Sequence, residues 1–193
     1  DSRIDAMKKA NKELVDNLLG QSSTNRIGLV SYNNSVMLAN TLNLTNAKSL
    51  LDAKIDSWIP GGATCICCGI LAARDMFKNL SPKEKQKVMI VMSDGVATSS
   101  KDCKPLLGNV GNMNNDKAIN MHDDYAINAS WNAIQSIENL IVYSIGLGGT
   151  NNPTILDEEM LKLVAAAGNG EYYYADVNTI IDIYKDVANS VTK

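Results

Sequence analysis

Two short apolar runs constrain the fold of this chain more than any other feature. Residues 88–92 read Val-Met-Ile-Val-Met, and residues 140–145 read Leu-Ile-Val-Tyr-Ser-Ile. Runs of this length are typical of strands covered on both faces, as in a parallel sheet. Between them, apolar residues recur at helical spacing: Ala126, Ala129, Ile134 and Ile137. The central part of the chain therefore predicts two parallel strands joined by a crossover helix.

The rest of the chain continues this alternation of helix and strand. An apolar pattern at residues 4–18 predicts a helix that closes at Gly20, and residues 26–32 predict a strand. The turn at residues 33–34 predicts a hairpin whose second strand lies at residues 35–39. Further elements are expected as helices at residues 45–58, 64–79, 156–167 and 177–187, and as a strand at residues 171–175. Because crossovers are right-handed, the natural product is an α/β fold with a doubly wound sheet and helices on both faces.

Length, charge and motif content exclude several classes of protein. A chain of 193 residues predicts one domain, residues 1–193. The net charge of −3 disfavours nucleic acid as a partner. No run reaches the roughly 18 apolar residues of a membrane span. With one His, and without G-x-S-x-G, Walker or G-x-G-x-x-G motifs, we expect no enzyme.

Two loops carry oxygen-bearing side chains beside apolar elements. Pro-Gly-Gly-Ala-Thr ends at Thr64 before one predicted helix, and Met-Ser-Asp-Gly places Asp94 directly after the strand at residues 88–92. Hydroxyl and carboxylate oxygens are the ligands that hard divalent cations prefer. Each residue also has an ordinary interpretation, because Thr is a common helix N-cap and Asp a common turn residue before Gly. The two loops together, at the ends of adjacent elements, favour a cation site.

The order of these segments resembles the von Willebrand factor type A family over nearly the whole chain. The resemblance rests on Gly61-Gly62-x-Thr64, on the apolar strand that ends in Asp94-Gly95, on the strand at residues 141–146, and on the closing segment at residues 161–175. It implies a Rossmann-like, mostly parallel sheet with one antiparallel edge strand. Among bacterial members, the crowded cysteines and the Asn-rich insertion look most similar to domains of pilus-associated or other surface proteins.

The resemblance also implies a metal-ion-dependent adhesion site, or MIDAS. By position, Thr64 and Asp94 match metal ligands of the family, while Gly62, Gly95 and Asn33 fall on the ligand-binding rim. The bound ion is expected to be Mg²⁺, or Mn²⁺ or Ca²⁺, with one coordination position completed by a carboxylate of a protein, host or matrix ligand. Other subunits of a surface assembly are further expected partners, and an extracellular or cell-surface location follows.

One element of the family does not appear in the printed sequence. Members open with an apolar strand ending in Asp-x-Ser-x-Ser, which lies at the centre of the sheet and supplies the first metal-binding loop. Without that loop the metal site is expected to be weakened or absent. Without the strand, residues 27–32 and 88–92 lack their shared neighbour, so we expect an upstream segment or a separate polypeptide to complete the sheet.

Four cysteines, Cys65, Cys67, Cys68 and Cys103, lie near these loops. If both loops meet at one end of the sheet, Cys103 can reach one of the other three, and a disulfide is the preferred interpretation. Zinc is an alternative, although C-x-C-C lacks the usual paired C-x-x-C pattern. Buried free thiols are a further alternative. Which cysteines pair stays open, because four cysteines allow three connectivities.

The polar segment at residues 98–125 follows the Asp94 loop and is interpreted as a rim insertion that contributes to partner specificity. Within it, His122-Asp123-Asp124 is expected to be a solvated helix start, with a second metal site as the alternative. Two functions remain open for the whole chain. It is a metal-dependent adhesion or protein-binding module, or it is a metal-independent structural or interaction domain of a surface assembly.

Overall fold

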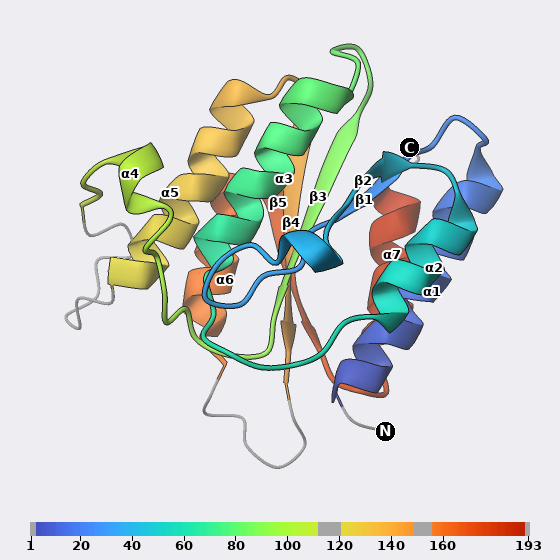
Figure 1. Ribbon diagram of the computed structural model, residues 1–193, viewed down its shortest axis with the longest axis horizontal. Coiled ribbons are helices and arrows are strands. Elements are labelled where there is room, and N and C mark those ends of the chain that lie inside the picture. The colour runs from blue at the N-terminus through green and yellow to red at the C-terminus, as the bar shows by residue number, and fades with distance from the viewer. Residues whose placement is uncertain (1–2, 112–120, 149–155, 192–193) are drawn as a thin grey trace.

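The computed structural model describes residues 3–111, 121–148 and 156–191. Helices and strands alternate through them (Figure 1), in the order α1 (Arg3–Gln21), β1 (Ile27–Leu29), η1 (Leu38–Asn40), β2 (Leu42–Thr45), α2 (Lys48–Asp56), α3 (Ile66–Leu80), β3 (Lys87–Ser93), α4 (Lys104–Leu107), α5 (Met121–Ser136), β4 (Leu140–Leu147), α6 (Glu158–Ala167), β5 (Asn169–Ala175) and α7 (Ile180–Val191). The two apolar runs form β3 and β4, as the sequence predicts. None of the described helices is both long and apolar enough to span a membrane.

The main sheet is parallel, with the order β3-β4-β5. Ser93 is in register with Gly146, and Leu147 with Ala175, so the three strands end at the same edge. Helices cover both faces, with α3, α5 and α6 on one side and α1 and α7 on the other (Figure 1). The buried side chains of β4 divide accordingly, since Val142 packs with the first helix group and Ile145 with the second. This burial on both faces explains the lack of polar alternation in the strand sequences.

Strands β1 and β2 form a separate antiparallel sheet, with Ile27 opposite Thr45 and Leu29 opposite Leu42. Within the described residues, β1 has β2 as its sheet neighbour and β3 has β4. Direct pairing of β1 with β3 is therefore not observed among these residues, and the strand expected to complete the sheet stays a prediction. A side chain connects the turn after β1 to β3, because the Tyr32 hydroxyl donates a hydrogen bond of 2.5 Å to the carbonyl of Met92.

The predicted second strand of the hairpin was placed too early. It was expected at residues 35–39, but β2 spans Leu42–Thr45. A tight turn closes through the bridge between Tyr32 and Val36, and the short helix η1 then separates that bridge from β2. The next helix also begins later in the chain than the sequence predicts. Thr45 belongs to β2 and its hydroxyl accepts from the amide of Ala47, so α2 begins at Lys48.

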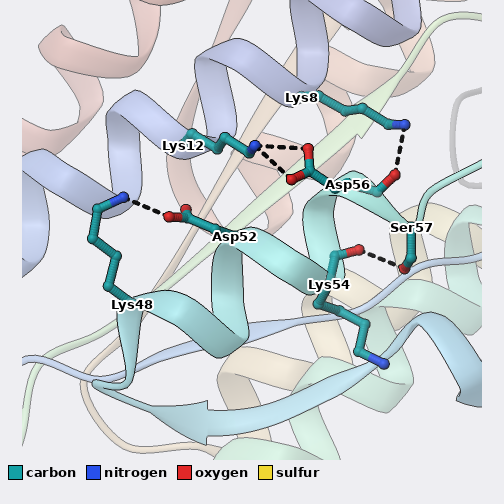
Figure 2. A network of polar contacts seen from close by, with 7 residues as sticks. All are labelled: Lys8, Lys12, Lys48, Asp52, Lys54, Asp56 and Ser57. Atoms are coloured by element: carbon teal, nitrogen blue, oxygen red, sulfur yellow. Dashed lines mark hydrogen bonds and ion pairs between the residues drawn. The ribbon is translucent and has the colours of Figure 1, made fainter.

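Polar contacts hold α2 against α1 at the surface (Figure 2). Lys12 forms an ion pair of 2.6 Å with Asp56, and Lys8 donates to the carbonyl of Asp56. Lys48 pairs with Asp52 of its own helix and with Asp16 of α1, and hydrogen bonds to these two carboxylates raise its pKa above the ordinary range. Exposed pairs of this kind contribute little to stability, because water and salt screen them. Their role is to orient α2, which leads into the loop before α3.

Candidate metal-binding rim

The candidate site lies at the carboxyl end of β3. Ser93 is the last residue of the strand, and its hydroxyl both donates to the carbonyl of Gly95 and accepts from the Gly95 amide. This tight turn leaves the Asp94 side chain 57% exposed at the edge where the three strands end. Ligands of open α/β sheets bind at this edge. Asp94 and Gly95 therefore lie where the sequence predicts them, on the rim.

The Gly61-Gly62 loop is shaped by glycine and braced by the turn at Asn33-Asn34. Gly61 and Gly62 have φ values of +148° and +86°, which disfavour residues with a Cβ. A Cβ on Gly62 would also lie 2.8 Å from Oδ1 of Asn34, which accepts a hydrogen bond from the Ala63 amide. The carbonyl of Asn33 accepts from the amide of Cys65 at 2.7 Å. Asn33 and Gly62 are thus parts of one braced corner.

Thr64 is tied to the segment that follows Asp94. Its amide donates to the hydroxyl of Thr98 at 2.9 Å, and its carbonyl accepts from the amides of Thr98, at 3.0 Å, and Ser99, at 3.3 Å. These three hydrogen bonds join the Thr64 loop to the segment that directly follows the Asp94 loop. The N-cap of α3 is Cys65, one residue later, so the alternative role of Thr64 as an ordinary helix cap is not observed.

Arg3 is a member of the rim that the sequence analysis missed. Its guanidinium lies 3.3 Å from Oδ2 of Asp94 and also donates to the Asp94 carbonyl. The topology could have indicated it, because helices that alternate with parallel strands begin at the carboxyl edge of the sheet, and Arg3 begins α1. A cation of the protein itself therefore contacts the carboxylate that is expected to bind a metal.

Tyr32 lies beneath the same carboxylate. Burial, and then the negative charge of Asp94, raise the pKa of Tyr32 above its ordinary value. The ring also lies against Gly69 of α3, where a Cβ would come within 2.5 Å of it. Tyr32 therefore stays neutral and joins β1, α3 and the end of β3 just below the rim.

Residues 98–111, the described first part of the segment at residues 98–125, begin at the rim and then run along the side of the helical layer (Figure 1). Thr98 and Ser99 contact the Thr64 loop, as described above. Farther on, the Tyr125 hydroxyl donates to the carbonyl of Gly108 at 2.7 Å and holds the region after α4 against α5. Three residues of its Asn-rich part, Asn112, Asn114 and Asn115, lie outside the described residues.

The prediction of a solvated helix start at residues 122–124 was wrong. Asp123 and Asp124 are 2% and 4% exposed, because α5 packs into the core from its first turn, where Tyr125 is 1% exposed. Nδ1 of His122 lies 2.9 Å from the hydroxyl of Ser100. Within the described part of the chain, this group is not among those whose ligand atoms cluster as a metal site requires.

The cysteines form two disulfides, Cys67–Cys103 and Cys65–Cys68. The first joins the start of α3 to the segment after Asp94, which confirms the prediction that Cys103 reaches one of the other three. All four side chains are buried. The Cys67–Cys103 disulfide therefore ties the start of α3, next to the Thr64 loop, to the segment after Asp94 from inside the protein.

The donor set fits a hard cation in part. The chain offers a hydroxyl at Thr64 and an exposed carboxylate at Asp94, and the guanidinium of Arg3 stands against that carboxylate as a positive charge. Octahedral Mg²⁺ is commonly held by one or two protein carboxylates together with waters. Thr64 and Asp94 are the rim residues that would hold such an ion, with its remaining positions left to other donors.

Comparison with known proteins is consistent with this geometry. The family model described as the von Willebrand factor type A domain matches residues 1–185. No curated protein sequence matches the chain. Among solved structures, the chain is similar to the vWF domain of the type V pili tip protein Mfa5 from Porphyromonas gingivalis, with a TM-score of 0.73 and 16% identity over 98% of this chain and 88% of that one.

Two further structures extend the comparison. The conserved hypothetical protein BatB from Bacteroides thetaiotaomicron has a TM-score of 0.71 and 18% identity, and the match covers 100% of this chain and 88% of that one. Proximal thread matrix protein 1 from the mussel byssus, solved with a zinc-occupied MIDAS motif, has a TM-score of 0.65 and 22% identity over 96% of this chain and 42% of that one. At these identities the likeness establishes the shared fold.

Proposed function

The chain belongs to the von Willebrand factor type A family, and from this premise we propose that it is a metal-ion-dependent adhesion or protein-binding domain of a cell-surface or pilus protein. The observation that carries the proposal is the exposed carboxylate of Asp94 at the end of β3, beside a Thr64 loop held by three hydrogen bonds. The pilus proteins among the structural neighbours support the kind of parent protein.

Recognition depends on charge. Thr64 and Asp94 would hold Mg²⁺, or Mn²⁺ or Ca²⁺, through one neutral and one anionic oxygen. Because so little negative charge would come from these two residues, the ion would keep a strong attraction for a further anionic oxygen. A carboxylate of the protein, host or matrix ligand would supply it. The braced corner at Asn33 and Gly62 and the turn at Gly95 would form the surrounding rim.

The chain's own residues prepare the site and carry out no chemical reaction. Arg3 balances the charge of Asp94 in the ion pair, and a bound cation would take its place at this carboxylate. Disulfides below the rim keep both loops in place and fit an extracellular setting, because disulfides persist in oxidising compartments. We expect no enzymatic activity.

A strand partner belongs to the same proposal. An extended segment, from elsewhere in the parent protein or from a separate polypeptide, pairs with the facing edges of β1 and β3, which lie in different sheets. Hydrogen exchange tests this directly. Slower exchange of the β1 and β3 amides in the parent protein than in this chain alone supports the pairing, and equal exchange contradicts it.

The second candidate function is a metal-independent structural domain of a surface assembly. The Arg3–Asp94 ion pair favours it, because it satisfies the carboxylate without any metal. In this case the rim acts as a packing surface between subunits, and the segment at residues 98–125 becomes the main contact region.

Calorimetric titration of Mg²⁺ and Mn²⁺ into the metal-free protein separates the two functions. The panel contains the wild type, Thr64→Ala and Asp94→Ala, with Asp102→Ala as a control that removes an exposed acid from the neighbouring segment. Saturable binding that is weakened by the first two substitutions and unchanged by the third supports the metal-dependent function. Absence of binding to the folded wild type rejects it.

A further inference from the structure

The four cysteine sulfurs form one compact cluster, separate from the oxygens of the rim. All four Sγ atoms lie within 4.8 Å of one another. Besides the two disulfide bonds, Sγ of Cys65 lies 3.7 Å from that of Cys67 and 3.8 Å from that of Cys103, and Sγ of Cys68 lies 3.7 Å from that of Cys103. Among the described residues, this is the group whose ligand atoms converge closely enough for a metal ion.

These contacts between non-bonded sulfurs match the dimensions of a zinc tetrathiolate. With Zn–S bonds of about 2.3 Å, the sulfurs of a tetrahedral site lie about 3.8 Å apart. Three of the six sulfur pairs already have that spacing. The two disulfide-bonded pairs have Cα–Cα separations of 5.3 and 6.2 Å, which leaves room for their sulfurs to move apart by rotation of the side chains.

The surroundings of the cluster suit a structural metal site. The four cysteines are between 0% and 4% exposed, so no position is open to solvent or substrate. Cys65 is the N-cap of α3, a helix of 15 residues, and Cys67 and Cys68 lie in its first turn. The positive end of a helix dipole lowers the pKa of thiols and stabilises thiolates placed there.

We propose that in its thiol form this cluster is a closed, tetrahedral site for one Zn²⁺ ion, with Cys65, Cys67, Cys68 and Cys103 as the four ligands. The thiol form arises in the newly made chain before oxidation, or by reduction. In the reduction, two molecules of a dithiol reductant give four electrons and four protons to the two disulfides and leave as disulfides. Zn²⁺ then displaces the four thiol protons.

The ion takes over the task of the disulfides. Cys67–Cys103 ties the start of α3 to the segment after Asp94, and a metal shared by all four residues makes the same connection without an S–S bond. Both rim loops are then held at their base in a reducing compartment as well as in an oxidising one. The site is distinct from the rim, because it consists of buried sulfur and the rim of exposed oxygen.

The test uses the whole chain, reduced with a phosphine, desalted without air and titrated with Co²⁺ as a spectroscopic probe for Zn²⁺. We expect uptake of one equivalent with the strong visible absorption of tetrahedral cobalt thiolate, and displacement of the Co²⁺ by one equivalent of Zn²⁺. Asp94→Ala is expected to give the same cobalt thiolate absorption, and the oxidised chain is expected to give none of it. Cys103→Ser is expected to lose the tetrathiolate spectrum.

Circular dichroism of the same samples keeps the test decisive if the reduced chain unfolds. Recovery of helical signal on adding one equivalent of Zn²⁺ to the wild type, but not to Cys103→Ser, supports the site through metal-coupled folding. No uptake by the reduced wild type overturns the proposal. So does uptake that Cys103→Ser leaves unchanged, or uptake that Asp94→Ala removes, since the latter places the ion at the rim.

Discussion

The cysteine cluster and the Asp94–Thr64 rim lie within a few residues of each other but are held in opposite ways. The cluster is buried and closed by two covalent bonds. The rim is exposed, and hydrogen bonds and one surface ion pair hold it. Cys65 directly follows Thr64, so the rigid base and the open ligand position share one loop. Such a contrast is typical of a binding site. The buried disulfides fix the position of the loop, and the exposed oxygens of the rim remain available to bind a ligand.

The disulfides provide the largest expected effect on stability. Loop-closure entropy predicts that removing Cys67–Cys103, which spans 36 residues, costs about 4 kcal/mol, whereas removing Cys65–Cys68, which spans 3, costs about 2 kcal/mol. The matched variants are the double substitutions to Ser at positions 67 and 103 and at positions 65 and 68. Urea unfolding of the oxidised proteins measures both. Equal losses would show that the longer bridge does not join the rim segments as described.

The Gly62 corner tests whether the rim also depends on backbone shape. Gly62→Ala places a Cβ at φ +86° and 2.8 Å from Oδ1 of Asn34, and is expected to cost about 2 kcal/mol. Gly108→Ala is the control, because Gly108 has a similar φ of +71° but nothing lies within 4 Å of its Cβ position, and it should cost about 1 kcal/mol. The comparison is again made by urea unfolding. A larger loss at Gly108 than at Gly62 would contradict the bracing role of Asn34.

Tyr32 links the two sheets just below Asp94, and Tyr32→Phe is expected to cost about 1 kcal/mol by leaving the Met92 carbonyl without its donor. Burial and the charge of Asp94 raise the pKa of Tyr32 in the folded state, so above pH 10 the unfolded chain ionises first. The contribution of Tyr32 is therefore complete below pH 10 and is lost as the pH rises further. Unfolding measured at pH 8 and pH 10.5 checks this, because the gap between wild type and variant should shrink.

The sequence predicted the parts of this contrast that depend on local pattern. The apolar runs are enough to locate β3 and β4, because a strand that is buried on both faces has a continuous apolar sequence. The positions of Thr64 and Asp94 followed from the order of loops on successive strands. The disulfide pairing could not be predicted, because sequence spacing alone does not order four neighbouring sulfurs in space.

Other features depend on tertiary packing, which the local sequence does not indicate. Asp123 and Asp124 were expected in solvent, because charge normally indicates an exposed face, yet α5 is buried from its first turn. Strand β2 was misplaced because a short helix, η1, lengthens the hairpin connection. Arg3 was missed because its partner is 91 residues away along the chain.

Substitution of Arg3 therefore gives the sharpest test of the exposed rim, and it has the smallest expected effect on stability. Its ion pair with Asp94 is half exposed, so Arg3→Ala should change the free energy of unfolding by less than about 0.5 kcal/mol. The same substitution removes a positive charge that competes with a cation for Asp94. Affinity for Mn²⁺ should rise by up to about two-fold, since a competing pair of about 0.5 kcal/mol corresponds to this factor.

Calorimetric Mn²⁺ titrations of the wild type, Arg3→Ala and Arg3→Lys measure the effect, with Lys8→Ala as a control that removes a positive charge from the same helix at its contact with Asp56. Arg3→Lys keeps the charge and should stay near the wild type. If Arg3→Ala binds Mn²⁺ more weakly than the wild type, Arg3 orders the carboxylate for the metal and does not compete with it. If all four proteins bind alike, Arg3 does not compete with the ion, and the Arg3–Asp94 pair is then no measure of how open the rim is to a cation.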